Sequence, residues 1–145
     1  MSSNNSLNQS YKPRKIAIVD DVYDMLLVYS LALEDSGHEV IFTATSGEEI
    51  VNKILAGDRT IDTIIMDYRM TGINGLEAVQ IIKNQRPNIE IIMASADDSV
   101  MDNALKMGVS QFLIKPFSLS ELVNSVSNRW CKFNLNVTYI QFTSD

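Results

Sequence analysis

Five short apolar runs alternate with five longer segments of helical character, and this alternation constrains the fold more than any other feature of the sequence. The predicted strands are Ile16–Val19, Val40–Thr43, Ile61–Met66, Ile89–Met93 and Gln111–Ile114, and the predicted helices are Val22–Asp35, Ser46–Ala56, Gly75–Arg86, Asp98–Met107 and Ser118–Lys132. Continuous apolar runs are typical of strands buried on both faces. Strands that alternate with helices form right-handed βαβ units. The sequence therefore predicts an α/β fold, a five-stranded parallel sheet with helices on both faces.

The alternation occupies most of a chain of 145 residues, the size of one domain. Residues 1–13 are rich in Ser and Asn and have no periodicity, so we expect a disordered leader before a domain at 14–132. The tail 133–145 alternates apolar and polar residues like a strand, and its role is left unassigned. The start of the chain lacks the apolar stretch of a signal peptide, and no run is long enough to span a membrane. The single cysteine, Cys131, cannot form an internal disulfide, so a cytoplasmic location is expected.

The charge of the chain argues against direct binding of nucleic acid. It has 12 Lys and Arg against 18 Asp and Glu, a net charge of −6. A nucleic-acid-binding domain needs a basic surface for the phosphates. The one histidine, His38, precedes a predicted strand, where we expect a surface turn, and one His with one Cys cannot form a Cys/His metal cluster.

Charged or hydroxyl residues of the types that form catalytic and binding sites follow four of the five predicted strands. They are Asp20, Asp21, Asp67, Ser95 and Lys115. In an open parallel sheet the binding site lies beyond the carboxyl ends of the strands. Three crowded carboxylates repel one another unless a cation lies among them, and oxygen ligands favour a hard ion such as Mg²⁺. A carboxylate beside a metal and a lysine is suited to nucleophilic attack on a phosphoryl group.

Each of these residues also has an ordinary structural explanation. Asp20 or Asp21 alone suits a helix N-cap, and Asp67 alone suits a turn. Ser95 alone is a loop serine, and Lys115 alone is a solvated lysine. The ordered occurrence of all of them at successive strand ends favours a common site.

The motifs at these strand ends resemble the receiver domain of bacterial and archaeal response regulators over about residues 14–131. They are Asp20-Asp21, Ile64–Asp67, Met70–Gly75, Ala94–Ala96 and Lys115–Phe117. The resemblance implies the flavodoxin-like doubly wound sheet with strand order 2-1-3-4-5. Thr71 stands where the family often has Pro, and Asn74 replaces a common Asp. Neither departure affects the expected chemistry.

The resemblance also implies a role for each residue of the site. Asp67 becomes the phosphoacceptor, which takes a phosphoryl group from a sensor histidine kinase or a phosphotransfer protein. Mg²⁺ is held by Asp20, Asp21, Asp67 and the backbone carbonyl of Arg69. Ser95 and Lys115 bind the phosphoryl oxygens, and Ser95 with Phe112 forms the conformational switch.

We therefore expect a stand-alone receiver that signals to an unidentified downstream protein and is not an enzyme beyond its own phosphorylation and dephosphorylation. Alternatively, the partner is a second copy of the chain, in a homodimer that forms on phosphorylation. The alternative functions are a Mg²⁺-dependent phosphatase with an aspartate nucleophile and a pseudo-receiver that works without phosphorylation. Such phosphatases place a second Asp two residues after the nucleophile, where this chain has Arg69. A flavodoxin-like cofactor site is disfavoured, because the acidic residues after the first strand repel phosphate.

Three further expectations concern local structure. The Lys115–Pro116 bond is expected to be cis, because the chain turns sharply there. The helix at 22–35 has more apolar residues than one packed face needs, so Met25 and Val28 are expected to protrude and dock a partner. Arg69 and Asp97 are expected to pair over the phosphoryl group and slow its hydrolysis. The competing interpretation leaves Arg69 in solvent and Asp97 as a helix cap.

Overall fold

The structure, a computed structural model, describes residues 12–127, so most of the leader, Cys131 and the tail lie outside the described residues. Strands and helices alternate along these residues as the sequence predicts. In chain order they are β1 (Lys15–Val19), α2 (Tyr23–Asp35), β2 (Glu39–Ala44), α3 (Gly47–Leu55), β3 (Thr63–Asp67), α4 (Gly75–Gln85), β4 (Glu90–Ser95), the 3-10 helix η1 (Asp98–Val100), α5 (Met101–Lys106), β5 (Gln111–Ile114) and α6 (Leu119–Ser127). The strands form one sheet in the order β2-β1-β3-β4-β5, and every pair is parallel. The predicted fold and strand order are confirmed.

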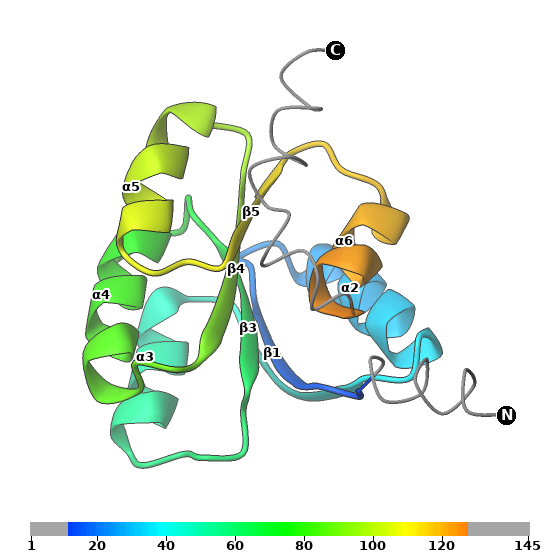
Figure 1. Ribbon diagram of the computed structural model, residues 1–145, viewed down its shortest axis with the longest axis horizontal. Coiled ribbons are helices and arrows are strands. Elements are labelled where there is room, and N and C mark those ends of the chain that lie inside the picture. Colours follow the sequence, from blue (N-terminus) through cyan, green and yellow to red (C-terminus); the bar gives the residue numbers. More distant parts are fainter. Residues whose placement is uncertain (1–11, 128–145) are drawn as a thin grey trace, which may run out of the picture.

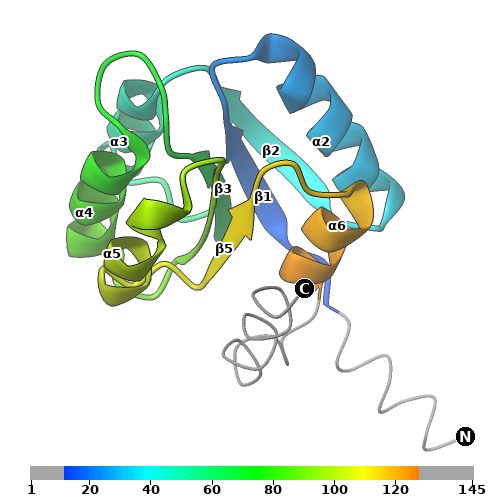
Figure 2. The ribbon, with the colours of Figure 1, turned by 90° about the horizontal axis from the view of Figure 1, so that it is seen from above.

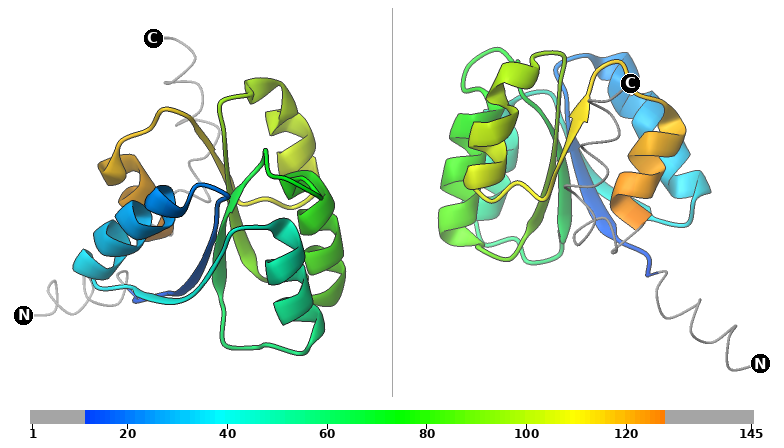
Figure 3. Two further views of the ribbon diagram at one scale, coloured as in Figure 1. Left: turned by 180° about the vertical axis from the view of Figure 1, so that it is seen from behind. Right: turned by 45° about the horizontal axis from the view of Figure 1, so that its top comes forward.

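Helices cover both faces of the sheet. Helices α3, α4 and α5 lie on one face, and α2 and α6 lie on the other (Figures 1 and 2). The same two layers are seen from behind in Figure 3. No helix in residues 12–127 is long and apolar enough to cross a membrane.

The buried side chains of the inner strands form two core clusters, one on each face of the sheet. In β3 the adjacent residues Ile64 and Ile65 are both buried, Ile64 against α3 and α4 and Ile65 against α2 and α6. Ala17 and Ile18 of β1 divide in the same way. Successive side chains of a strand point to opposite faces, which is why these runs are apolar without interruption. Burial on both faces fixes the strands whose ends carry the site.

Three α-helices begin with side-chain caps that their sequences favour, and at the start of α6 Ser118 Oγ accepts the backbone N–H of Glu121 over 3.0 Å. Ser46 Oγ accepts the backbone N–H of Glu49 over 3.3 Å at the start of α3. At the start of α4, Asn74 and Glu77 form a reciprocal capping box, with both bonds 2.9 Å long. Asn74, which stands where the family often has Asp, is therefore a good helix cap.

The structure corrects two local expectations. The single helix expected at 98–107 is a 3-10 turn followed by α5, and Asp97 caps the short turn by accepting the backbone N–H of Ser99 over 3.1 Å. His38 is not a surface residue: its side chain is 5% exposed. Its Nδ1 accepts the backbone N–H of Arg14 over 3.0 Å, and its Nε2 lies 2.8 Å from Ser127 Oγ. His38 thereby links β1 to the end of the described part of α6.

Candidate functional site

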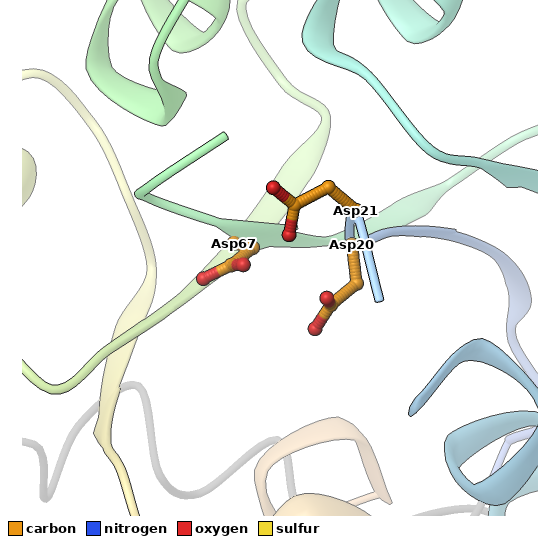
Figure 4. Close-up of side chains that lie close together, drawn as sticks. All are labelled: Asp20, Asp21 and Asp67. Atoms are coloured by element: carbon orange, nitrogen blue, oxygen red, sulfur yellow. The ribbon is translucent and has the colours of Figure 1, made fainter. Parts of the chain in front are cut away.

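Three carboxylates meet where β1 and β3 end. Asp20 and Asp21 follow β1 directly, Asp67 is the last residue of β3, and these two strands are neighbours in the sheet. Oxygen atoms of the three side chains lie within 4.8 Å of one another (Figure 4). Asp20 is 2% exposed and Asp67 is 7% exposed, whereas Asp21 is exposed to solvent. The site is thus open on one side and buried on the other.

The alternative explanation of the aspartates after β1, a helix cap, is not what the structure shows. The N-cap of α2 is Val22, which makes no side-chain cap bond. Asp20 Oδ1 instead accepts the backbone N–H of Val22 over 2.9 Å. This turn holds Asp20 in place, with its other oxygen, Oδ2, near Lys115.

Lys115 lies against the buried side of the cluster. Its Nζ is 3.2 Å from Asp67 Oδ1 and 3.6 Å from Asp20 Oδ2. Its backbone N–H donates to the carbonyl oxygen of Ser95 over 2.9 Å, which fixes the end of β5 against β4. The Lys115–Pro116 peptide bond is cis, as predicted.

Burial and charge shift the pKa values of both partners of this ion pair. Burial raises the pKa of Asp67 to about 6, with the charge of Asp20 acting in the same direction and the charge of Lys115 opposing both. Burial acts to lower the pKa of Lys115, but the carboxylates of Asp67 and Asp20 outweigh it, and the pKa is raised. Near neutral pH the site therefore holds a lysine cation beside an ionised Asp67.

The donor set of the cluster suits a hard divalent cation. Three carboxylate groups converge, and one lysine cannot neutralise them all. Mg²⁺ prefers oxygen ligands, and carboxylates as close as these need a positive charge among them. Asp20, Asp21 and Asp67 therefore fit a magnesium ion.

Ser95, Arg69 and Asp97 lie at the same edge of the sheet. Ser95 ends β4 and is buried, and its Oγ accepts the backbone N–H of Asp97 over 3.0 Å. Arg69 Nη2 donates to Asp97 Oδ2 over 3.2 Å, so the predicted pair is formed. Asp97 is also a cap of η1, so both of its expected interactions occur together. Phe112, on β5, is half-buried against the α3–α4 side of the core.

A shallow pocket of about 430 Å³ adjoins the exposed side of the carboxylates. It is lined by Asp21, Tyr68, Arg69, Met70, Thr71 and Asn74. Most of these residues belong to the loop between β3 and α4, so this loop forms one wall of the site.

Sequence reasoning missed two residues next to the site. Tyr29 of α2 is 5% exposed and stacks on Phe117 with ring centroids 5.6 Å apart, which packs α2 against the segment after Lys115. Glu48 of α3 accepts the backbone N–H of Ile73 over 3.1 Å and so reaches the β3–α4 loop. Tyr29 belongs to an apolar helix in which no single residue stands out, and Glu48 lies 25 positions before Ile73 in the chain.

The apolar surface of α2 differs in part from the expected one. Val28 is 40% exposed, as expected, but Met25 is half-buried and packs against the core under α2. The exposed apolar residues, which we call the α2 face, are Val22, Tyr23, Leu27, Val28 and Leu31. The register of the helix turns Met25 toward the sheet and Leu31 toward solvent.

The chain is similar to known proteins over the residues that carry the site. Residues 16–127 match the response regulator receiver domain. The chemotaxis protein CheY of Thermotoga maritima is 32% identical over 116 residues, which are 79% of this chain and 95% of that protein. The regulatory protein PhoP of Bacillus subtilis is 32% identical over 111 residues, which are 75% of this chain but only 45% of PhoP.

Solved structures agree with the sequence comparisons. The CheX–CheY–BeF3–Mg complex from Borrelia burgdorferi matches with a TM-score of 0.74 at 27% identity, over 79% of this chain and 87% of that one. The response regulator TrrA of Thermotoga maritima, in complex with Mg²⁺ and BeF, matches with a TM-score of 0.69 at 28% identity, over 78% of this chain and 96% of that one. With its strand order, its acidic cluster and its match over 16–127, the chain belongs to the response regulator receiver domain family.

Proposed function

We propose that this protein is a phosphoacceptor of a two-component or phosphorelay system and takes a phosphoryl group onto Asp67. The observation that carries the proposal is the position of the Asp67 carboxylate at a strand end, 3.2 Å from Lys115 and within 4.8 Å of two other carboxylates. Asp67 is 7% exposed, and its neighbours Asp21 and Tyr68 line the pocket beside it. A nucleophile needs this combination of a fixed direction and access to its substrate.

Asp20, Asp21, Asp67 and the backbone carbonyl of Arg69 are proposed to hold Mg²⁺. A bound magnesium ion neutralises charge on the phosphoryl oxygens as they approach the carboxylates. Two relatives at 27% and 28% identity were solved with Mg²⁺ and a beryllium fluoride group. Because the chain's own donors are all oxygens, its site has the same preference.

In the proposed reaction, an Asp67 carboxylate oxygen attacks the phosphorus of a phosphohistidine. A new phosphorus–oxygen bond forms as the phosphorus–nitrogen bond breaks, and the imidazole of the donor leaves with the bonding electrons. Lys115 Nζ and Ser95 Oγ receive the phosphoryl oxygens. The Ser95 hydroxyl then gives up its hydrogen bond from the Asp97 N–H and binds the phosphoryl group instead. Phe112 on the neighbouring strand changes conformation in response.

The proposed partners are a sensor histidine kinase or a phosphotransfer protein as donor and a downstream protein that reads the change at Ser95 and Phe112. The α2 face lies beside the site, since α2 follows Asp20 and Asp21 directly, and is proposed to dock the donor. A phosphorylation-dependent homodimer is the alternative output. We propose no catalytic activity beyond the chain's own phosphorylation and dephosphorylation.

The two alternative functions find less support. The phosphatase alternative needs a second acid two residues after Asp67, and Arg69 occupies that position and pairs with Asp97. The pseudo-receiver alternative needs no working site, whereas here the three acids, Ser95 and Lys115 come together at one edge.

Phosphate uptake measured by intact-mass spectrometry tests the proposal. Purified protein is incubated with acetyl phosphate, with Mg²⁺ or with EDTA. We expect the wild type to gain one phosphoryl group only with Mg²⁺ and Asp67→Asn to gain none. Equal uptake by both proteins would refute the assignment of Asp67.

A further inference from the structure

We propose that Glu48 is a positioning residue for the magnesium site, which it reaches through the backbone of the β3–α4 loop. The proposal deepens the proposed function and rests on it, because it assigns Glu48 the task of holding the loop that carries the Arg69 carbonyl. Glu48 belongs to α3, a helix that supplies none of the acidic cluster. It acts on the site from a separate element of the fold.

The contact between Glu48 and the loop is direct. Glu48 Oε2 accepts the backbone N–H of Ile73 over 3.1 Å. A carboxylate that accepts a backbone N–H makes a charge-assisted bond, which is stronger than a neutral one. The carboxylate group thus holds the loop at a point four residues after Arg69.

Two glycines permit this close approach. Gly72 has φ +85°, and a Cβ added to it would overlap Glu48 Oε2. Gly47, next to Glu48, is buried, and a Cβ added to it would lie 2.8 Å from Ile73 Cγ1. Each glycine therefore leaves room for a side chain of the other segment, Gly72 for Glu48 and Gly47 for Ile73.

The two ends of the loop are fixed by the adjoining elements. The backbone N–H of Tyr68 donates to Ala94 O over 3.0 Å, and that of Gly75 donates to Tyr68 O over 2.8 Å. The middle of the loop contains Thr71, at the position where the family often has a proline, whose ring would restrict φ. In this chain the side chain of Glu48 restrains the middle of the loop instead, through its contact with the Ile73 N–H.

The carboxylate of Glu48 is outside the acidic cluster. Among residues 12–127, the group of acids close enough to hold a metal consists of Asp20, Asp21 and Asp67. Glu48 therefore affects the affinity for Mg²⁺ through the loop and not as a ligand. Its substitution leaves the ligand set intact, and because Glu48 is exposed, the fold remains intact as well.

Three variants separate this role from a general effect of charge. Glu48→Ala removes the acceptor, and Glu48→Gln keeps a carbonyl oxygen that accepts the Ile73 N–H but lacks the charge. Glu34→Ala, at an exposed position near the end of α2, removes a carboxylate elsewhere and is the matched control. Two quantities are measured: hydrogen exchange of the Ile73 amide by NMR in metal-free protein, and the dissociation constant of Mg²⁺ by calorimetry.

For Glu48→Ala we expect the Ile73 amide to exchange about tenfold faster and Mg²⁺ to bind about fivefold more weakly. Glu48→Gln, which keeps an acceptor but makes a weaker neutral bond, should recover part of both losses, and Glu34→Ala should match the wild type. Unchanged exchange at Ile73, or faster exchange with unchanged Mg²⁺ affinity, would overturn the positioning role. A wild type that binds no Mg²⁺ would overturn the proposed function, while exchange at Ile73 would still report whether Glu48 holds the loop.

A double-mutant cycle tests the contact itself. Gly72→Ala places a methyl group against Glu48 in the wild type, but in the Glu48→Ala background this overlap is gone. We therefore expect Gly72→Ala to weaken Mg²⁺ binding less in the Glu48→Ala protein than in the wild type. Equal effects in both backgrounds would contradict a contact between the two residues.

Discussion

Arg69 and Asp97 form an ion pair that joins the loops after β3 and β4, with Arg69 Nη2 and Asp97 Oδ2 3.2 Å apart. Each residue lies two positions after a proposed phosphoryl-site residue, Arg69 after Asp67 and Asp97 after Ser95. Asp97 holds its place because its other oxygen, Oδ1, caps η1 through the Ser99 N–H. The hydrogen bonds from Ser99 and then the pairing with Arg69 lower the pKa of Asp97, so it stays ionised at neutral pH.

Removing this pair should shorten the lifetime of phospho-Asp67. Hydrolysis needs a water molecule in line with the phosphorus–oxygen bond, and the role we propose for the Arg69–Asp97 pair is to hinder its approach. We expect Arg69→Ala to lose phosphate about two to five times faster than the wild type, a modest factor because Arg69 is largely exposed. The decay of phosphoprotein after removal of the donor measures the rate.

Asp97→Asn is the matched partner variant. Asparagine keeps an oxygen that caps η1 but loses the charge that holds Arg69. Its decay rate should equal that of Arg69→Ala, and the double variant should decay no faster than either. Wild-type rates in all three variants would show that the pair does not control hydrolysis.

When the metal ion is removed, the charge of Asp67 should lower the free energy of unfolding. Without a metal ion the buried carboxylate of Asp67 faces Asp20 and Asp21, and burial and repulsion together outweigh the attraction of Lys115. We expect Asp67→Asn to raise the free energy of unfolding in EDTA by about 1–3 kcal/mol, measured by urea denaturation. Asp35→Asn, which removes an exposed acid at the end of α2, should change it by less than about 0.5 kcal/mol.

Added Mg²⁺ should reduce this difference in stability between the wild type and Asp67→Asn. At a concentration ten times its dissociation constant, a ligand that binds only the folded state adds about 1.4 kcal/mol to the free energy of unfolding. The wild type should gain this amount and Asp67→Asn should gain much less. Equal stabilisation of both proteins would place the metal elsewhere.

His38 should make the fold less stable in mild acid. Burial lowers the pKa of His38, the charge of Arg14 lowers it further, and Asp62 opposes both. The folded state then binds fewer protons than the unfolded state, so the free energy of unfolding falls as the pH drops below about 6.5. Protonation of Nδ1 also removes the acceptor for the Arg14 N–H.

His38→Gln is the comparison for the pH effect. Glutamine has an oxygen to accept the Arg14 N–H and an amide near Ser127, but it does not titrate in this range. Urea denaturation at several pH values should show a steeper loss for the wild type than for His38→Gln. The chain has one histidine, so its imidazole signal in NMR is unambiguous. Parallel stability curves for the two proteins would contradict this account.

The α2 face should affect phosphotransfer from a protein donor and not from a small molecule. Leu31 is 70% exposed, so Leu31→Ser should change the free energy of unfolding by less than about 0.5 kcal/mol. We expect this variant to take phosphate from acetyl phosphate at the wild-type rate but more slowly from the best donor in a panel of purified histidine kinases. Leu55→Ser, at an exposed position on α3, is the control. Slower uptake from both kinds of donor would contradict a docking role.

The architecture and the main site were predictable because they depend on patterns that are local in the sequence. Buried strands such as β3 are apolar throughout, and each acid or lysine of the site directly follows such a run. The residues that were misjudged depend on packing between distant segments. His38 is buried because Arg14 and Ser127 converge on it, and Met25 is turned toward the sheet by the register of α2. Glu48 and Ile73 meet only because α3 and the β3–α4 loop pack together.

The proposal that Asp67 accepts the phosphoryl group is tested most directly by locating the acyl phosphate in the chain. Protein treated with acetyl phosphate and Mg²⁺ is reduced with borohydride, which converts an aspartyl phosphate to homoserine, and the digested peptides are sequenced by tandem mass spectrometry. We predict homoserine at position 67 in the wild type, its absence without Mg²⁺, and unmodified Asp20 and Asp21 in every sample. Homoserine at position 20 or 21, or at no position in phosphorylated protein, would contradict the account.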